Sequence, residues 1–192
     1  MQPIIAHLKR YIPLSGEEEA IFLGAVRTRR IRKKQLLLPE GDVCRQQWYV
    51  QSGCLYGYDL NEKGGMHIIK FAVEDQWIGD MHSFLCETPS LMNIEAAEAS
   101  VVIEISKPSL DELYTKIPQL ERFGRLNMES AFIAMQNRML AAISQTAEER
   151  YAAFAQQFPE LDQRLPQYMI ASYLGITAEF LSKIRKKLSS IS

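Results

Sequence analysis

Residues 167–186 read Gln-Tyr-Met-Ile-Ala-Ser-Tyr-Leu-Gly-Ile-Thr-Ala-Glu-Phe-Leu-Ser-Lys-Ile-Arg-Lys, a spacing typical of two short helices joined by a tight turn. Ala171 is small enough to let the helices approach, and Gly175 supplies the turn. Five apolar side chains would pack the pair together: Ile170, Leu174, Ile176, Leu181 and Ile184. The stretch therefore predicts a helix-turn-helix that holds its second helix at a fixed angle.

The free face of this second helix is polar and basic. Thr177 is placed to cap its N-terminus. From Arg164 to Ser192 there are five Lys or Arg and one acid, a charge of +4 in a chain of net charge −1. This segregation favours double-stranded DNA as a partner, although a purely structural hairpin is the alternative. The residues expected to contact DNA are Thr177, Glu179, Ser182, Lys183, Arg185, Lys186 and Lys187.

The composition indicates a folded protein of one large or two small domains, since 47% of the 192 residues are hydrophobic. No apolar run is long enough to span a membrane. Residues 1–14 contain His7, Lys9 and Arg10 where a signal peptide would be apolar, so we expect a cytoplasmic protein with no membrane partner. The three widely spaced cysteines suggest reduced, largely buried thiols with no metal site.

The first half of the chain predicts helical structure over Ile4–Val26, with a helix start at Ser15–Glu19 where Ser15 can cap, followed by short β-strands. Glycine turns at residues 41, 53, 64–65 and 79 divide runs rich in Val, Ile and aromatic residues. The clearest strands lie within 48–58, 66–73 and 100–106. This pattern is typical of an antiparallel roll or sandwich.

Six cations crowd the segment from Arg27 to Lys34. A charged edge strand that resists aggregation explains them, and a nucleic-acid patch is the alternative.

A long helix is expected from Pro118 to Gln145. Met128, Phe132, Met135 and Met139 repeat at spacings of 4, 3 and 4, which favours a helix that pairs with a second copy in a homodimer. Burial within a monomer is the alternative. A two-fold dimer would set two recognition helices about 34 Å apart, matching successive major grooves. Thr146 should cap the next helix, which ends at Phe158-Pro159.

The order of these elements resembles the bacterial Crp/Fnr family of transcription regulators, most specifically at Leu36–Asp42 and Gly175–Leu188. The resemblance implies an α+β fold in which an antiparallel β-roll of the cyclic-nucleotide-binding type (a double-stranded β-helix) precedes a dimerisation helix and a C-terminal helix-turn-helix. The corresponding domains are residues 1–117, 118–145 and 146–192. It also implies a homodimer that acts on RNA polymerase at promoters.

The resemblance departs at the phosphate-binding cassette. Asp80 stands where the family has Glu, and no arginine occurs between Gly79 and Glu121 to pair with a cyclic phosphate. We therefore expect no cyclic AMP binding and no cofactor, and an unknown small-molecule effector or none. Residues of the degenerate ligand pocket would be Gly79, Asp80, Met81, His82, Ser90 and Leu91. Haem ligation by His67 or His82 has no specific support.

A second departure lies in the recognition helix. Ala178 replaces the Arg that reads guanine in well-known members, so the operator should differ. Glu179 could accept a hydrogen bond from cytosine, and Lys183 could reach a guanine edge or a phosphate. The wing strands should be short or missing, which would leave phosphate binding to the basic residues of this helix.

Two other functions are weighed against DNA binding. A signalling adaptor would use the β-roll for a ligand and the hairpin for assembly. A cupin-type enzyme would need clustered histidines, but only His7, His67 and His82 occur, and no hydrolase or P-loop motif is present. We therefore expect no enzymatic activity.

Overall fold

The computed structural model describes residues 3–62 and 64–189. The chain forms two compact units. The sensor unit comprises residues 1–59 and 69–129, and the C-terminal unit comprises residues 60–68 and 130–192. The long helix α5 (Gln119–Ser144) and the hairpin of β4 (Leu55–Leu60) and β5 (Met66–Ala72) run from one unit into the other.

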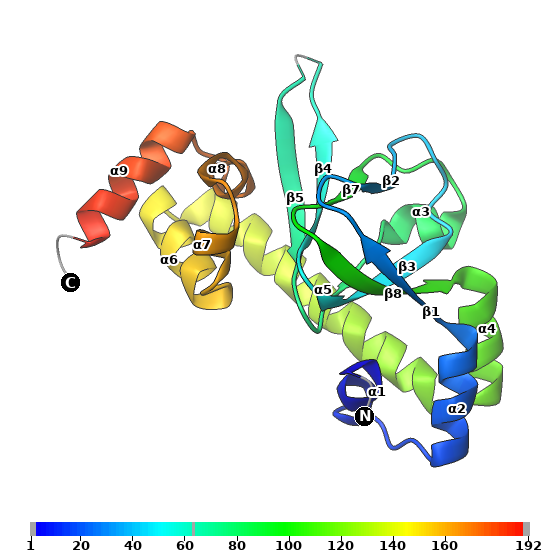
Figure 1. The fold of residues 1–192 in the computed structure, drawn as a ribbon. Coiled ribbons are helices and arrows are strands. Elements are labelled where there is room, and N and C mark those ends of the chain that lie inside the picture. The colour runs from blue at the N-terminus through cyan, green and yellow to red at the C-terminus, as the bar shows by residue number, and fades with distance from the viewer. Residues whose placement is uncertain (1–2, 63, 190–192) are drawn as a thin grey trace. The chain divides into compact units, whose positions relative to one another are not determined.

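The strands form two four-stranded sheets (Figure 1). The pairings of β8 with β1 and β3, of β7 with β2 and β4, and of β3 with β6 are antiparallel. One sheet has the order β1-β8-β3-β6 and the other β2-β7-β4-β5. The remaining strands are β1 (Arg27–Ile31), β2 (Leu36–Leu38), β3 (Gln46–Ser52), β6 (Trp77–Ile78), β7 (Asn93–Ala96) and β8 (Ser100–Ser106). The prediction of an antiparallel β-roll is confirmed.

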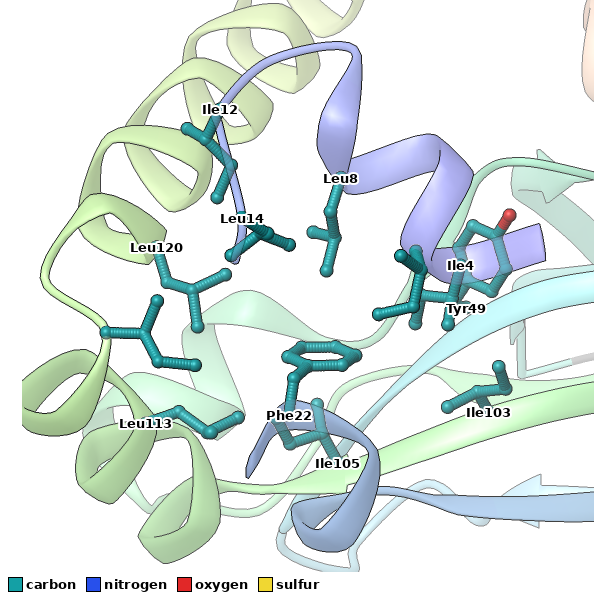
Figure 2. Packing of buried hydrophobic residues seen from close by; sticks show 12 residues of the cluster. Ile4, Leu8, Ile12, Leu14, Phe22, Tyr49, Ile103, Ile105, Leu113 and Leu120 are labelled. Carbon is teal, nitrogen blue, oxygen red and sulfur yellow. The ribbon is translucent and has the colours of Figure 1, made fainter. Parts of the chain in front are cut away.

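Alternation along the central strands builds two cores in the sensor unit. Trp48 and Val50 of β3 and Val102 of β8 join a cluster with residues from both sheets. The intervening Tyr49 and Ile103 point to the opposite face, where they meet helices. These helices are α1 (Pro3–Lys9), α2 (Gly16–Ala25), α4 (Lys107–Lys116) and the start of α5 (Figure 2). The central strands β3 and β8 of this sheet are therefore covered on both faces.

The N-terminal segment forms two helices, α1 and α2. The helical structure expected over Ile4–Val26 is confirmed as α1 and α2, and the chain is not helical between them, around Pro13, which lacks an N–H donor and restricts the residue before it. The Ser15 cap is confirmed as a capping box with Glu18.

The turn between β3 and β4 requires a glycine. Gly53 has φ 94°, and a Cβ there would lie 2.3 Å from Ser100 Oγ.

The basic segment after Arg27 forms β1, which is an edge strand of its sheet. Arg29 Nη1 donates to Glu104 Oε2 of the neighbouring β8 at 3.1 Å, while Arg27 and Arg30 are exposed. The edge-strand interpretation is confirmed.

The C-terminal unit contains four further helices: α6 (Ala147–Gln157), α7 (Leu161–Arg164), α8 (Gln167–Leu174) and α9 (Ala178–Ser189). Thr146 caps α6 in a capping box with Glu149, as predicted. The short helices α7, α3 (Met81–Cys86) and α4 were not predicted. None of the helices within residues 3–62 and 64–189 has the length and apolar character needed to cross a bilayer.

Candidate functional site

The turn between α8 and α9 has the geometry that the sequence predicts. Gly175 adopts the left-handed conformation at φ 68° and ψ 34°, which an L side chain rarely occupies. The Ile176 N–H donates to Ala171 O at 3.0 Å, which closes the end of α8. Thr177 Oγ1 accepts from Phe180 N at 3.2 Å, so its role as N-cap of α9 is confirmed.

Helix α9 separates an apolar face from a polar one. Leu181 and Ile184 are buried against the unit, with 0% and 1% of their surface exposed. Lys183 and Lys186 are exposed, as are Thr177 and Glu179, and Ser182 is half-buried. The outward face therefore presents two lysines together with hydrogen-bonding side chains, a combination suited to phosphates and base edges.

Arg185 does not join this outward face, contrary to our expectation that it contacts DNA. Its Nη2 donates to Asp162 Oδ1 of α7, and Tyr151 Oη donates to Asp162 Oδ2 at 3.0 Å. The guanidinium carbon lies 5.8 Å from the centre of the Tyr151 ring, and only 20% of the Arg185 side chain is exposed. The charge is thus used inside the unit, because an unpredicted helix supplies an acid partner.

Lys187 is paired with an acid, as Arg185 is, but its side chain is exposed, as those of Lys183 and Lys186 are. Its Nζ lies 2.9 Å from both carboxylate oxygens of Glu148, but 59% of its side chain is exposed. A pair this exposed is worth at most about 1 kcal/mol, so a phosphate could compete for the lysine.

A second set of contacts in the C-terminal unit holds the tip of the β4–β5 hairpin. Ser172 Oγ on α8 donates to Met66 O at 2.7 Å and accepts from Ile68 N at 3.0 Å. Arg138 of α5 donates to Ile68 O at 2.9 Å and to Tyr173 O at 3.0 Å, with its guanidinium 4.1 Å from the Tyr173 ring centre. These residues could not be identified from the sequence, where their signal is an arginine within an apolar helical repeat.

Helix α5 carries large apolar side chains that its own chain leaves exposed. The predicted dimer residues Met128, Phe132, Met135 and Met139 have 41%, 60%, 65% and 59% of their surface exposed. Ile143 is 79% exposed on the same helix. The alternative that this helix is buried within a monomer is wrong for these positions, and a row of this kind is typical of a protein–protein interface.

The residues of the predicted ligand pocket lie in and just before α3 and in the segment that precedes β7. Asp80 caps α3 by accepting from Ser83 N at 3.1 Å, and its other oxygen accepts from the buried Ser90 Oγ at 2.7 Å. His82 and Leu91 are exposed, and Gly79 packs against the Gln47 amide. Met81 also lines a cavity formed with residues of α1, α4 and α5. Asp80 therefore stabilises the local fold.

Metal ligands are not clustered in the described part of the chain, where no group of three His, Cys, Asp or Glu side chains is placed to hold an ion. Cys44 and Cys54 are buried, but Cys86 is exposed. The expectation of buried thiols is thus wrong for Cys86, which lies at the exposed end of α3.

A β-roll followed by a long helix and a helix-turn-helix defines a class of transcription regulator. The Cyclic nucleotide-binding domain family matches residues 28–116. The chain is 30% identical over 169 residues to the Fumarate and nitrate reduction regulatory protein of Yersinia pestis, covering 82% of this chain and 67% of that protein. It is 29% identical over 176 residues to the Anaerobic regulatory protein of Pasteurella multocida, and the match covers 86% of this chain. The matched segment spans 64% of that relative, which is less than two thirds of its length.

Solved structures give the same architecture. FixK2 from Bradyrhizobium japonicum superposes with a TM-score of 0.74 at 20% identity, covering 86% of this chain and 85% of FixK2. A CooA mutant from Carboxydothermus hydrogenoformans superposes with a TM-score of 0.72 at 15% identity, covering 96% of this chain and 84% of CooA. At these identities the likeness shows the fold. With the sequence relatives above, the chain belongs to the Crp/Fnr family of transcriptional regulators.

Proposed function

We propose that this chain regulates transcription as a homodimer that binds double-stranded DNA through α9. The observation that carries the proposal is the sorting of side chains on this helix. Leu181 and Ile184 fasten one face to the unit, while Lys183 and Lys186 project from the other. A helix fixed in this way can enter a major groove with its cations near phosphates.

The exposed row on α5 supports a two-fold assembly. Pairing of Phe132, Met135 and their neighbours with the same residues of a second copy would cover this apolar surface. The dimer would place two α9 helices about one DNA turn apart, so its operator would be palindromic with half-sites about 10 base pairs apart. An adaptor that does not bind DNA explains the apolar row but not the outward lysines of α9.

The operator should differ from one read by an arginine at the start of the recognition helix, because Ala178 has no polar side-chain atom. Glu179 and Lys183 are the residues placed to read bases, and Lys186 and Lys187 would contact phosphates. We further propose that the regulator acts on RNA polymerase in the cytoplasm and catalyses no reaction.

Cyclic AMP is not the expected effector, and we propose no cofactor. The Asp80 carboxylate is already hydrogen-bonded to Ser83 and Ser90. The cassette from Gly79 to Asn93 contains no Arg or Lys to balance a buried phosphate.

Selection from a random duplex library tests the proposal. We expect enrichment of a palindromic sequence, and sedimentation of the selected complex should give two chains per duplex. Met135→Lys should weaken the dimer and the complex, whereas Asn137→Lys, at an exposed polar position of the same helix, should not. Failure to enrich any duplex at low salt would contradict the proposal.

A further inference from the structure

The sensor unit contains a cavity of about 80 Å³ away from most of the predicted pocket. Leu8, Phe22, Ile105 and Leu120, shown in Figure 2, form part of its wall. The same wall includes Met81 and Phe84 of α3 and Leu110 of α4. The first turns of α5 close it with Phe123, Asn127 and Met128.

Two polar groups in this wall have unmet hydrogen-bonding capacity. Gln47 Nε2 and Trp77 Nε1 are buried, and neither has a hydrogen-bond partner among the described residues. Gln47 is 7% exposed as a residue. Both groups are donors, and burying an N–H without an acceptor is unfavourable, so native proteins rarely leave such donors unpaired.

Gly79 makes room for this arrangement. A Cβ at position 79 would lie 2.3 Å from both the nitrogen and the oxygen of the Gln47 side-chain amide. Any larger residue would therefore displace Gln47. The sequence at this turn thus keeps the amide in the wall of the cavity.

The lining also sets the charge of a possible ligand. None of the described lining residues is Asp, Glu, His, Lys or Arg, and burial raises the pKa of the Tyr114 phenol, which stays neutral, so a charged molecule would lose its hydration without a counter-ion. The walls are mainly aliphatic and aromatic, which favours an apolar body.

We propose that this cavity binds a small uncharged organic molecule that has an apolar body and a hydrogen-bond-accepting oxygen, directed to Gln47 Nε2 and Trp77 Nε1. Its volume is about half that of the cavity of roughly 150 Å³ that binds benzene in another protein, so it encloses about half of a six-membered ring, with the carbonyl end innermost and the rest of the ligand at the opening of the cavity. The proposal concerns the sensor unit alone and does not depend on DNA binding.

The probe pair is cyclohexanone and methylenecyclohexane, which share a shape but differ in the accepting oxygen. In ¹⁵N-labelled protein each of the two tryptophans gives one indole N–H resonance. We expect cyclohexanone to shift the Trp77 resonance saturably. The Trp48 resonance should stay in place, because Trp48 belongs to the other core cluster and does not line the cavity. Methylenecyclohexane should bind at least about fivefold more weakly, since it leaves both donors unpaired.

Gln47→Leu tests the amide directly and should weaken cyclohexanone binding about fivefold or more. Gln46→Leu is the matched control, because Gln46 precedes it on β3 but does not line the cavity. An unmoved Trp77 resonance up to the solubility limit of the ketone would overturn the proposal. Equal binding of the two probes by the unmodified protein would also overturn it, and this comparison needs no variant to fold.

Discussion

The two units use polar groups in opposite ways. In the C-terminal unit, cations are sorted, so that Arg185 is bound to Asp162 while Lys183 and Lys186 face outward. In the sensor unit, the cassette lacks cations and its Asp80 is engaged with Ser83 and Ser90, while uncharged donors line a nearby cavity. The outward face of α9 therefore suits a polyanion, whereas the cavity of the sensor unit suits a neutral molecule.

The largest expected effect on stability comes from truncating a buried side chain beneath the cationic face of α9. Ile184→Ala should lower the free energy of unfolding of the C-terminal unit by about 2 to 5 kcal/mol, because it leaves a cavity in a tightly packed core. Urea denaturation measures this loss. Lys183→Ala, one position earlier on the exposed face, should have a free energy of unfolding within about 0.5 kcal/mol of the parent. Equal losses in both variants would contradict the division of α9 into a buried and an exposed face.

The next prediction compares the loss of stability on removing the half-buried Arg185 with the loss on removing the exposed Lys187. Arg185→Ala should destabilise the unit by about 1 to 3 kcal/mol, since it leaves the partly buried Asp162 carboxylate without its cation. Lys187→Ala breaks the exposed pair with Glu148 and should cost no more than about 1 kcal/mol. Thermal melting of both variants tests the difference. A larger loss for Lys187→Ala would reverse our assignment.

A smaller effect concerns phosphate contacts. Lys186→Ala should reduce the slope of log affinity against log salt by about 1, and it should weaken all duplexes similarly. Affinity for a selected and a scrambled duplex, measured over a salt series, gives this slope. Lys33→Ala provides a control on an exposed lysine of the sensor unit. An unchanged slope for Lys186→Ala would show that Lys186 does not contact a phosphate.

The smallest effect lies in the sensor unit, at a buried imidazole. Burial lowers the pKa of His7 below its ordinary value of 6.5, and the nearby Arg10 lowers it further. The folded state therefore binds fewer protons than the unfolded state, so stability should fall as the pH drops below about 6.5. Denaturation between pH 5 and 8, on the ordinary scale of histidine titration, checks this slope. His7→Phe should flatten it, and parallel curves for both proteins would contradict the assignment.

Local signals predicted much of the fold. Caps at Ser15, Thr146 and Thr177 depend on residues only three positions apart, and the Gly175 turn depends on its own backbone preference. These features could be inferred from the sequence because their partners lie within one helical turn. The apolar repeat on α5 was equally readable, since its spacing alone defines the helix face.

Features that depend on distant partners could not be predicted. Arg185 meets Asp162 across 23 positions, and Ser172 meets Ile68 across 104. The unpaired donors of Gln47 and Trp77 become evident only when strands and helices surround them. The sequence therefore indicated which face of α9 is polar, but not that Arg185 pairs with Asp162 inside the unit.

The most direct test of α9 as the DNA-reading element is a second duplex selection with Lys183→Ala. If Lys183 reads a base edge, the enriched operator should lose its preference at one position in each half-site, with a cost of about 1 to 3 kcal/mol at that position. Selection of an unchanged operator with unchanged affinity would contradict the central claim.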